Sequence, residues 1–231
     1  MDRSLFLELI RQTRKTLDSI KKFTQLSRGK FRDQEFGDFY YRAVTRDIEK
    51  NDLLLESFLN YVKAAIPTRK RGTINRFLTE ELKKHQALLE EKKAKILKGF
   101  EADLPETTVP DEPLRFILDS ILQYAATAIP PGGSIELLTK SAVLQKEMRE
   151  GQPFIKENGK VVEVLVSFTD KEPKEEAASP KEGVPDLILR LVEDMVERNR
   201  GIIRFEFDGI KAKRLVSLKL PVERREVVRY G

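Results

Sequence analysis

The stretch Pro113–Leu137, PLRFILDSILQYAATAIPPGGSIEL, constrains the fold of this chain more than any other part of the sequence. Apolar residues recur every three or four positions across Leu114–Ala125, which predicts an amphipathic helix. The following Pro130-Pro131-Gly132-Gly133 ends that helix, because proline lacks an amide hydrogen and glycine accepts positive φ. The next four residues read as the start of a strand. The stretch therefore predicts a helix that leads directly into a sheet, which is a mixed α and β architecture.

The composition excludes several classes of protein. The 231 residues contain no cysteine and one histidine, so disulfides, thiolate chemistry and metal sites built from cysteine or several histidines are excluded. We expect no cofactor and no bound metal. No stretch approaches the roughly 20 apolar residues of a membrane span, and the first residues lack the pattern of a signal peptide. These features predict a cytoplasmic protein without a membrane span.

The charge pattern favours an ordinary solvated surface. The sequence has 43 basic and 38 acidic residues, a net charge of +5, and the two signs are mostly intermixed. Neither a helix-turn-helix pattern nor an aromatic and basic RNA-binding motif is visible. We therefore expect no nucleic-acid partner.

The first 67 residues predict two long helices, Ser4–Ser27 and Gln34–Ala65, which are separated by a polar break around Gly29. Both carry apolar residues at the three- and four-residue steps of a bundle seam, including Phe6, Ile10 and Leu17 in the first helix and Ile48, Leu55 and Val62 in the second. An antiparallel hairpin of this kind exposes an apolar stripe when it stands alone. Two hairpins that pair into a dimeric four-helix bundle would cover the stripe, so we expect a homodimer.

The remainder predicts an α+β domain. We divide the chain into a hairpin at 1–67, a linker at 68–73 and a domain at 74–231. Within the domain the patterns predict, in order, strand Ile74–Phe77, helix Thr79–Glu91, strand Ala94–Ala102, the helix described above, strands Ser134–Leu144 and Val161–Thr169, helix Pro185–Arg198, and strands Ile202–Phe207 and Arg214–Leu220. This order predicts a sandwich with helices on one face of a sheet.

The order of these elements resembles that of sensor histidine kinases, which join a dimerising helical hairpin to an α/β ATP-binding domain. The stretch Pro113–Leu137 resembles their N-box, L-x-N-L-L-x-N-A-x-K-Y-T-P-x-G-G, with Ser120 and Tyr124 at the two asparagine positions. The first helix resembles the phosphoacceptor helix, but Arg11 stands where the family has the phosphoacceptor histidine.

The resemblance also identifies the nucleotide-binding positions, and their residues are unsuited to ATP. Tyr124 replaces the magnesium-holding asparagine, although Mg²⁺ prefers compact oxygen ligands. Phe168 falls on the acid that accepts a hydrogen bond from adenine; a register shifted by two residues would place Asp170 there, but without the glycine that should follow. Gly183 survives from the last phosphate loop, while Pro185 and Asp186 remove an amide donor and add negative charge. The resemblance therefore predicts a degenerate member without catalytic residues.

Arg11 cannot carry a phosphoryl group, because its guanidinium stays protonated at neutral pH. It is either a solvated helix residue or a cation that pairs with an acidic patch on a partner. By analogy with the family, we expect a partner-binding face formed by Arg11, Arg14, Lys15, Lys22, Phe23, Lys63 and Arg69. His85 is the remaining histidine, and we expect it to be an ordinary surface or boundary residue.

Three hypotheses follow. The first is a histidine-kinase-like pseudokinase of two-component signalling, a dimeric adaptor that binds a response regulator, a partner kinase or another signalling protein. The second is a histidine phosphotransferase, although that class keeps the histidine that Arg11 replaces. The third is a divergent ATP-dependent kinase or ATPase. An engineered or ancestral scaffold would give the same pattern.

Overall fold

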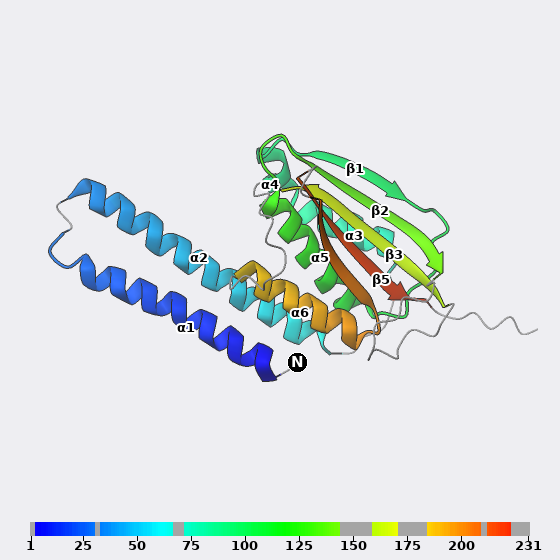
Figure 1. Cartoon of the computed structure of the whole chain (residues 1–231), viewed down its shortest axis with the longest axis horizontal. Coiled ribbons are helices and arrows are strands. Elements are labelled where there is room, and N and C mark those ends of the chain that lie inside the picture. The colour runs from blue at the N-terminus through cyan, green and yellow to red at the C-terminus, as the bar shows by residue number, and fades with distance from the viewer. Residues whose placement is uncertain are drawn as a thin grey trace, which may run out of the picture.

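The computed structural model describes residues 3–30, 33–66, 72–143, 159–170, 184–208 and 212–222. Its elements, in chain order, are α1 (Arg3–Leu26), α2 (Gln34–Ala64), α3 (Ile74–Lys84), α4 (Gln86–Glu91), β1 (Lys95–Phe100), α5 (Asp111–Ala128), β2 (Ser134–Val143), β3 (Lys160–Thr169), α6 (Val184–Arg198), β4 (Ile202–Asp208) and β5 (Lys213–Pro221). Figure 1 shows a long helical hairpin attached to a sheet that is covered by helices. Among the described residues, no helix is both long and apolar enough to cross a membrane.

The two N-terminal helices form the predicted antiparallel hairpin. Aromatic rings join them near both ends, Phe6 to Phe58 at 6.3 Å and Phe23 to Phe39 at 5.9 Å between centroids. The second helix begins after Asp33, whose side chain accepts a hydrogen bond from the amide of Phe36 at 3.1 Å. A side-chain cap of this kind satisfies one of the amides that a helix start leaves unpaired.

The apolar seam of α2 faces outwards in the single chain. The buried positions of this helix are mostly small or polar: Ala43, Asp47, Asn51, Leu54, Ser57, Tyr61 and Ala64. By contrast, Ile48, Leu55 and Val62 recur every seven residues and are 46%, 51% and 46% exposed. One face of α2 is therefore covered by α1 and by the helices of the domain, and a second, apolar face is left uncovered.

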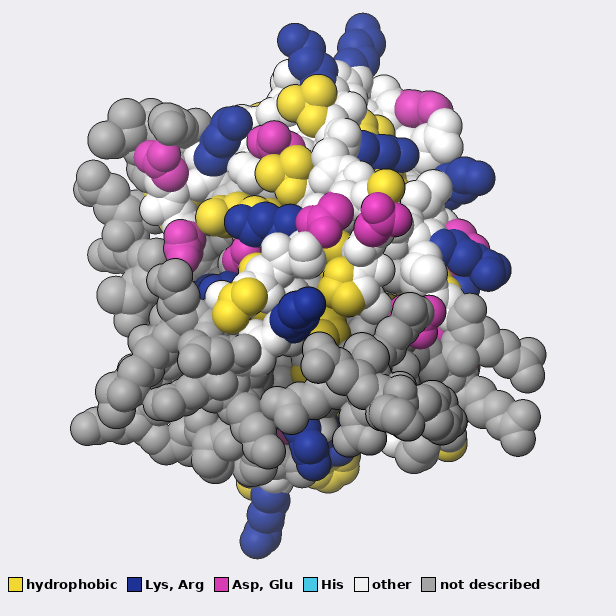
Figure 2. All heavy atoms as spheres, turned by 90° about the vertical axis from the view of Figure 1, so that its right-hand side faces the viewer, with side chains coloured by type: hydrophobic (Ala, Val, Ile, Leu, Met, Phe, Trp, Pro, Cys, Tyr) yellow, Lys and Arg dark blue, Asp and Glu magenta, His cyan; other side chains and the backbone are white. Residues whose placement is uncertain are grey.

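The sheet has five strands in the order β1-β2-β3-β5-β4, with β1 parallel to β2 and the other neighbours antiparallel. Alternate residues of the central strands, such as Val164 and Val166 in β3, are buried against α5 and α6. Figure 2 views the side of the molecule where the sheet lies, and there apolar, basic and acidic side chains are interspersed in the coloured region. An ion pair between Lys140 and Glu163 (Nζ to Oε2, 3.0 Å) joins two neighbouring strands, β2 and β3.

The structure differs from the sequence-based prediction at the start of the domain. Residues Ile74–Phe77 form no strand but open the helix α3, and the predicted helix Thr79–Glu91 is divided at His85 into α3 and α4. Thr73 caps the N-terminus of α3, where its hydroxyl accepts a hydrogen bond from the amide of Arg76 at 3.4 Å. Ile74, Phe77, Leu78 and Leu82 are buried, which is the spacing of a helix and not of a strand.

The hairpin packs against the helices of the domain, which places it over them as a further layer. Its α2 contacts α5 and α6, and α1 contacts α6. Tyr61 is the central residue of this interface: its ring meets Phe116 of α5 at 5.8 Å, edge to face, and its hydroxyl donates a hydrogen bond to Asp194 of α6. The hairpin and the domain therefore share one continuous core.

Candidate functional site

The candidate site lies where α5 crosses the end of β3, and two aromatic rings occupy it. The ring of Tyr124 meets Phe168 edge to face, with centroids 5.7 Å apart and planes at 86°. Phe168 is only 1% exposed. The helix and the strand thus bring together the two residues that the resemblance assigns to the magnesium ligand and the adenine acceptor.

A partly buried ion pair lies beside these rings. The guanidinium of Arg214 on β5 bonds the carboxylate of Asp170, which follows β3. Because Arg214 and Phe168 are paired across the two strands, the ion pair and the rings share one end of the sheet. The guanidinium also lies over the ring of Phe207, 5.3 Å from its centroid.

The electrostatics of the site keep the phenol neutral and the guanidinium charged. Burial raises the pKa of Tyr124, and Asp170 and Asp186 add to this effect while Arg214 opposes it. For Arg214, burial alone would lower the pKa, but the hydrogen bond to Asp170 and the charge interactions with Tyr124, Asp170 and Asp186 together outweigh it, and the pKa is raised. The site therefore holds a neutral phenol and a cation that is already paired.

The other positions assigned to nucleotide binding are dispersed. Ser120 is buried on α5, one turn before Tyr124, and faces the hairpin. Pro185 is exposed in the first turn of α6, where the missing amide hydrogen costs no helical bond. Gly183 lies outside the described residues.

The predicted partner-binding residues are distributed mainly along α1. Arg11, Lys15 and Lys22 are exposed and share one face of the helix, since they are four and seven residues apart. Arg11 pairs with Glu8, one turn earlier. Arg14 and Lys63 are also exposed, on α1 and α2. Phe23 is half-buried against Phe39, and Arg69 lies outside the described residues.

His85 sits at the junction of α3 and α4. Its Nε2 lies 2.9 Å from Oδ1 of Asp119, and its side chain is 14% exposed. Lys84 lies 4.0 Å from the same carboxylate oxygen. The imidazole therefore makes a structural contact between α3 and α5.

Two side-chain contacts in these regions were not predicted from the sequence. Nothing in a single sequence shows that Arg214 pairs with Asp170, because the contact depends on the register between β3 and β5. The bond from Tyr61 to Asp194 joins residues 133 positions apart and depends on how the hairpin packs. A buried tyrosine usually needs a hydrogen-bond partner for its hydroxyl. This general requirement indicates that such a partner exists, but it does not identify Asp194.

With this geometry established, the chain can be compared with known proteins. No protein-family model matches the sequence, and no curated protein matches it. Among solved structures, the Acinetobacter baumannii histidine kinase AdeS superposes with a TM-score of 0.56 at 11% identity, covering 91% of this chain and 97% of that one. The chain has a histidine-kinase-like fold.

Two further solved structures are similar. Full-length ShkA, in complex with AMPPNP, has a TM-score of 0.50 at 17% identity over 81% of this chain and 39% of its own. A nucleotide-free catalytic domain of the histidine kinase ThkA has a TM-score of 0.47 at 17% identity over 65% of this chain and 93% of its own. The predicted α+β class, a helical region followed by a domain resembling histidine-kinase ATPase domains, is confirmed.

Proposed function

We propose that this chain is a non-catalytic, histidine-kinase-like protein of two-component signalling. It acts as a dimeric adaptor that binds a response regulator, a partner kinase or another signalling protein. The observation that carries this proposal is the contact between Tyr124 and Phe168, whose rings pack together at the positions assigned to the magnesium ligand and the adenine acceptor.

The chemistry of this pair argues against nucleotide binding. A phenylalanine ring has no acceptor for the adenine amino group, and a neutral phenol is a poor ligand for Mg²⁺. Arg214, the nearby cation, is engaged by Asp170 and would have to exchange that partner for a phosphate. Rings that pack edge to face also contribute roughly 0.5–1.5 kcal/mol beyond their burial, which opposes opening the site.

Calorimetry with AMPPNP and Mg²⁺ tests the loss of nucleotide binding. The chain should give no binding heat, and a micromolar Kd would refute the proposal. The matched variant Tyr124→Asn restores an amide side chain at the position assigned to the magnesium ligand. Phe168 still occupies the position assigned to the adenine acceptor. We expect this variant to remain without binding as well.

The uncovered stripe of α2 supports the homodimer. Ile48, Leu55, Leu59, Val62 and Ile66 recur at heptad spacing and are 46–62% exposed. A sustained heptad of this kind is typical of a helix that packs against another helix. A second copy of the hairpin supplies the matching surface, in an arrangement with closed two-fold symmetry.

Light scattering tests the dimer directly. The wild type should have twice the chain mass of 26.7 kDa, whereas Leu55→Lys combined with Leu59→Lys should give a monomer with unchanged helix content. Glu56→Lys places a lysine on the same exposed turn but outside the stripe, where it reverses a charge, so this variant should stay dimeric. A monomeric wild type would contradict the proposal.

The basic face of α1 supports an acidic partner. Arg11, Lys15 and Lys22 are exposed side by side, and such a face accelerates association with a negatively charged surface. Incubation with phosphorylated receiver domains should show salt-sensitive binding that Arg11→Glu and Lys15→Glu weaken. Acid-labile phosphate on the chain, lost in His85→Ala, would instead point to a phosphotransferase.

A further inference from the structure

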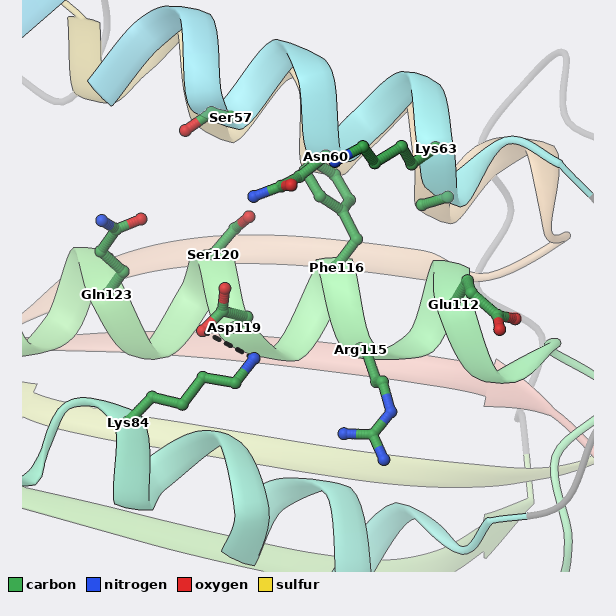
Figure 3. Close-up of a pocket in the computed structure, with 11 residues that line it drawn as sticks. Ser57, Asn60, Lys63, Lys84, Glu112, Arg115, Phe116, Asp119, Ser120 and Gln123 are labelled. Carbon is green, nitrogen blue, oxygen red and sulfur yellow. Dashed lines mark ion pairs between the residues drawn. The ribbon is translucent and has the colours of Figure 1, made fainter. Parts of the chain in front are cut away.

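A half-open pocket between α2 and α5 has a lining of mixed charge, with Lys63 and Lys84 beside Glu112 and Asp119. Figure 3 shows Lys84 directed at Asp119, so part of this charge is already paired. Such a lining favours no single class of ligand. The edge of the sheet differs from the pocket, because it combines free backbone groups with charge of one sign.

The strand β1 forms one edge of the sheet and is open to solvent along most of its length (Figure 1). Residues 95–99 are all exposed, whereas on β4, at the other edge, only Glu206 and Asp208 are exposed. Within the part of the chain that the structure describes, β1 pairs with β2 alone. One side of β1 therefore lacks a strand partner.

The backbone of β1 presents a regular row of hydrogen-bonding groups at this edge. In the parallel pair with β2, the amide of Lys95 donates to the carbonyl of Gly133 at 2.9 Å. Successive residues of a strand direct their amides and carbonyls to opposite sides, so the groups of Ile96, Lys98 and Phe100 point away from β2. An extended segment placed alongside would bond to them and continue the sheet.

The strand and the turn before it are basic. Residues 92–100, KKAKILKGF, contain four lysines and no acid. The first of these lysines donates to the end of α5. The other three, Lys93, Lys95 and Lys98, are exposed, and none of them forms an ion pair with another described residue.

The nearby acids leave this charge in excess. Glu101, which follows β1, accepts hydrogen bonds from the amide and the hydroxyl of Ser141 at 2.7 and 2.6 Å. Glu91 belongs to α4 and lies before the strand. Glu136 of β2 lies opposite Leu97 and supplies one carboxylate beside the lysines. The strand itself therefore carries only positive charge.

These lysines disfavour a second copy of the chain at this edge. Two β1 strands side by side would bring their lysines together, and like charges on neighbouring strands are destabilising. Lysines on an edge strand commonly prevent such self-pairing. An acidic segment meets the opposite condition, because its carboxylates pair with the same ammonium groups.

The order of side chains along β1 specifies the partner further. Ile96 and Lys98 lie on the face that the helices cover, since the residues opposite them on β2 are buried in the core. Lys95 and Leu97 lie on the other face, because side chains alternate along a strand. Each face thus offers one aliphatic and one cationic side chain, and Ile96 and Leu97 are 38% and 57% exposed.

A segment with the order acid, apolar, apolar, acid complements these four residues. Its acids lie beside Lys95 and Lys98, and its apolar side chains cover Ile96 and Leu97. The order reads the same in both directions, so it suits a parallel and an antiparallel strand alike. We propose that β1 is a docking edge for an extended acidic segment of this pattern in a partner protein, which joins the five-stranded sheet as an additional strand.

The test is an NMR titration of the isotope-labelled full chain with the capped hexapeptide Thr-Glu-Val-Val-Glu-Thr. Binding should be saturable, and the amides of Ile96, Lys98 and Phe100 should shift and exchange more slowly with deuterium. The amides of Leu97 and Gly99 face β2 and should change less. Thr-Glu-Pro-Pro-Glu-Thr lacks two amide donors and Thr-Lys-Val-Val-Lys-Thr reverses the charge, so each should bind about tenfold more weakly.

Variants of the chain separate the role of charge from that of the backbone. Lys95→Glu combined with Lys98→Glu should invert the preference, so that the lysine peptide binds about tenfold more tightly than the glutamate peptide. Lys21→Glu combined with Arg28→Glu changes the net charge equally at exposed positions outside β1 and should keep the wild-type preference. Ile96→Pro removes an outward amide but no bond to β2, and it should abolish the slowed exchange at the edge.

Three results would overturn the proposal. These are no saturable binding of the glutamate peptide at millimolar concentration, equal binding of the two charged peptides, or shifts that map to α1 in place of β1. Light scattering that finds an assembly larger than a dimer, which Ile96→Pro reduces, would assign the edge to a second copy and overturn it as well. If Ile96→Pro fails to fold, the inverted preference of the two-lysine variant decides the question.

Discussion

At the scale of single residues, Glu163 shows how a carboxylate is tolerated on a largely buried strand position. It is 9% exposed, and its oxygens meet Lys140 at 3.0 Å, Lys219 at 4.0 Å and the hydroxyl of Ser217 at 3.0 Å. Burial alone would raise the pKa of Glu163, but these partners outweigh it and the pKa is lowered from its usual 4.5. The carboxylate is therefore more acidic in the folded state than in the unfolded chain.

This shift predicts a pH dependence of stability. A lowered folded-state pKa contributes stability at pH values above 4.5, and that contribution is lost as the pH falls below it, because the unfolded chain takes up the proton first. Glu163→Gln should flatten the acid limb of the free energy of unfolding, measured by urea titration from neutral pH to pH 3. Glu206→Gln, exposed on β4, should leave that limb unchanged. An acid limb that survives in Glu163→Gln would contradict the assignment.

At the scale of elements, the C-terminal end of α5 is held by a lysine from another part of the chain. The ammonium of Lys92 donates to the carbonyl oxygens of Ala126 at 2.5 Å and Thr127 at 2.8 Å. A cation there satisfies carbonyls that the helix leaves unpaired and complements the negative end of its dipole. The contact also ties the end of α5 to the loop before β1.

Removing this cap should weaken α5 locally. Lys92→Met keeps the aliphatic stem but loses the charge, and we expect about 0.5–2 kcal/mol less stability. Urea unfolding would measure the loss, and hydrogen exchange should show it first at the last turn of α5. Lys98→Met on the exposed β1 strand is the matched control. Equal destabilisation by both variants would mean that the cap contributes nothing specific.

The elements also show why part of the fold was predictable from the sequence. Strands such as Val161–Thr169 were placed within one residue, because β-branched runs between polar loops leave few alternatives. The strand expected at Ile74–Phe77 is wrong for an identifiable reason. It was predicted from a run of only four residues, whereas Thr73 as a cap and the buried spacing of Ile74, Phe77 and Leu78 over a longer stretch indicate a helix.

The candidate sites were predictable to different degrees. Tyr124 and Phe168 could be singled out because a motif assigns them positions, but their ring contact depends on how α5 crosses the sheet. The polar pocket between α2 and α5, which Ser57 and Ser120 help to line, could not be predicted from the sequence at all. It exists because α2 packs on α5, and the relative placement of a hairpin and a domain leaves no local pattern in the sequence.

At the scale of the whole molecule, Tyr61 connects the hairpin to the domain. It is 2% exposed, packs on Phe116 and donates to Asp194, which also pairs with Arg198 at 2.7 Å. Burial first, and then the bond to Asp194, raise the pKa of Tyr61, so its hydroxyl remains a donor. Because Tyr61 belongs to α2 and Asp194 to α6, this bond acts on the packing between them.

Tyr61→Phe isolates that bond, since the ring and its contact with Phe116 remain. We expect a loss of about 1.5–3 kcal/mol, typical of a hydrogen bond to a charged group. If the bond mainly holds the hairpin in place, deuterium uptake should rise in α6 and in the C-terminal half of α2, while β3 and β5 stay protected. Tyr41→Phe, at a tyrosine that is 70% exposed, should change neither. Uptake that rises equally across the sheet would show instead that hairpin and domain unfold as one cooperative unit, with Tyr61 stabilising the whole and not the interface.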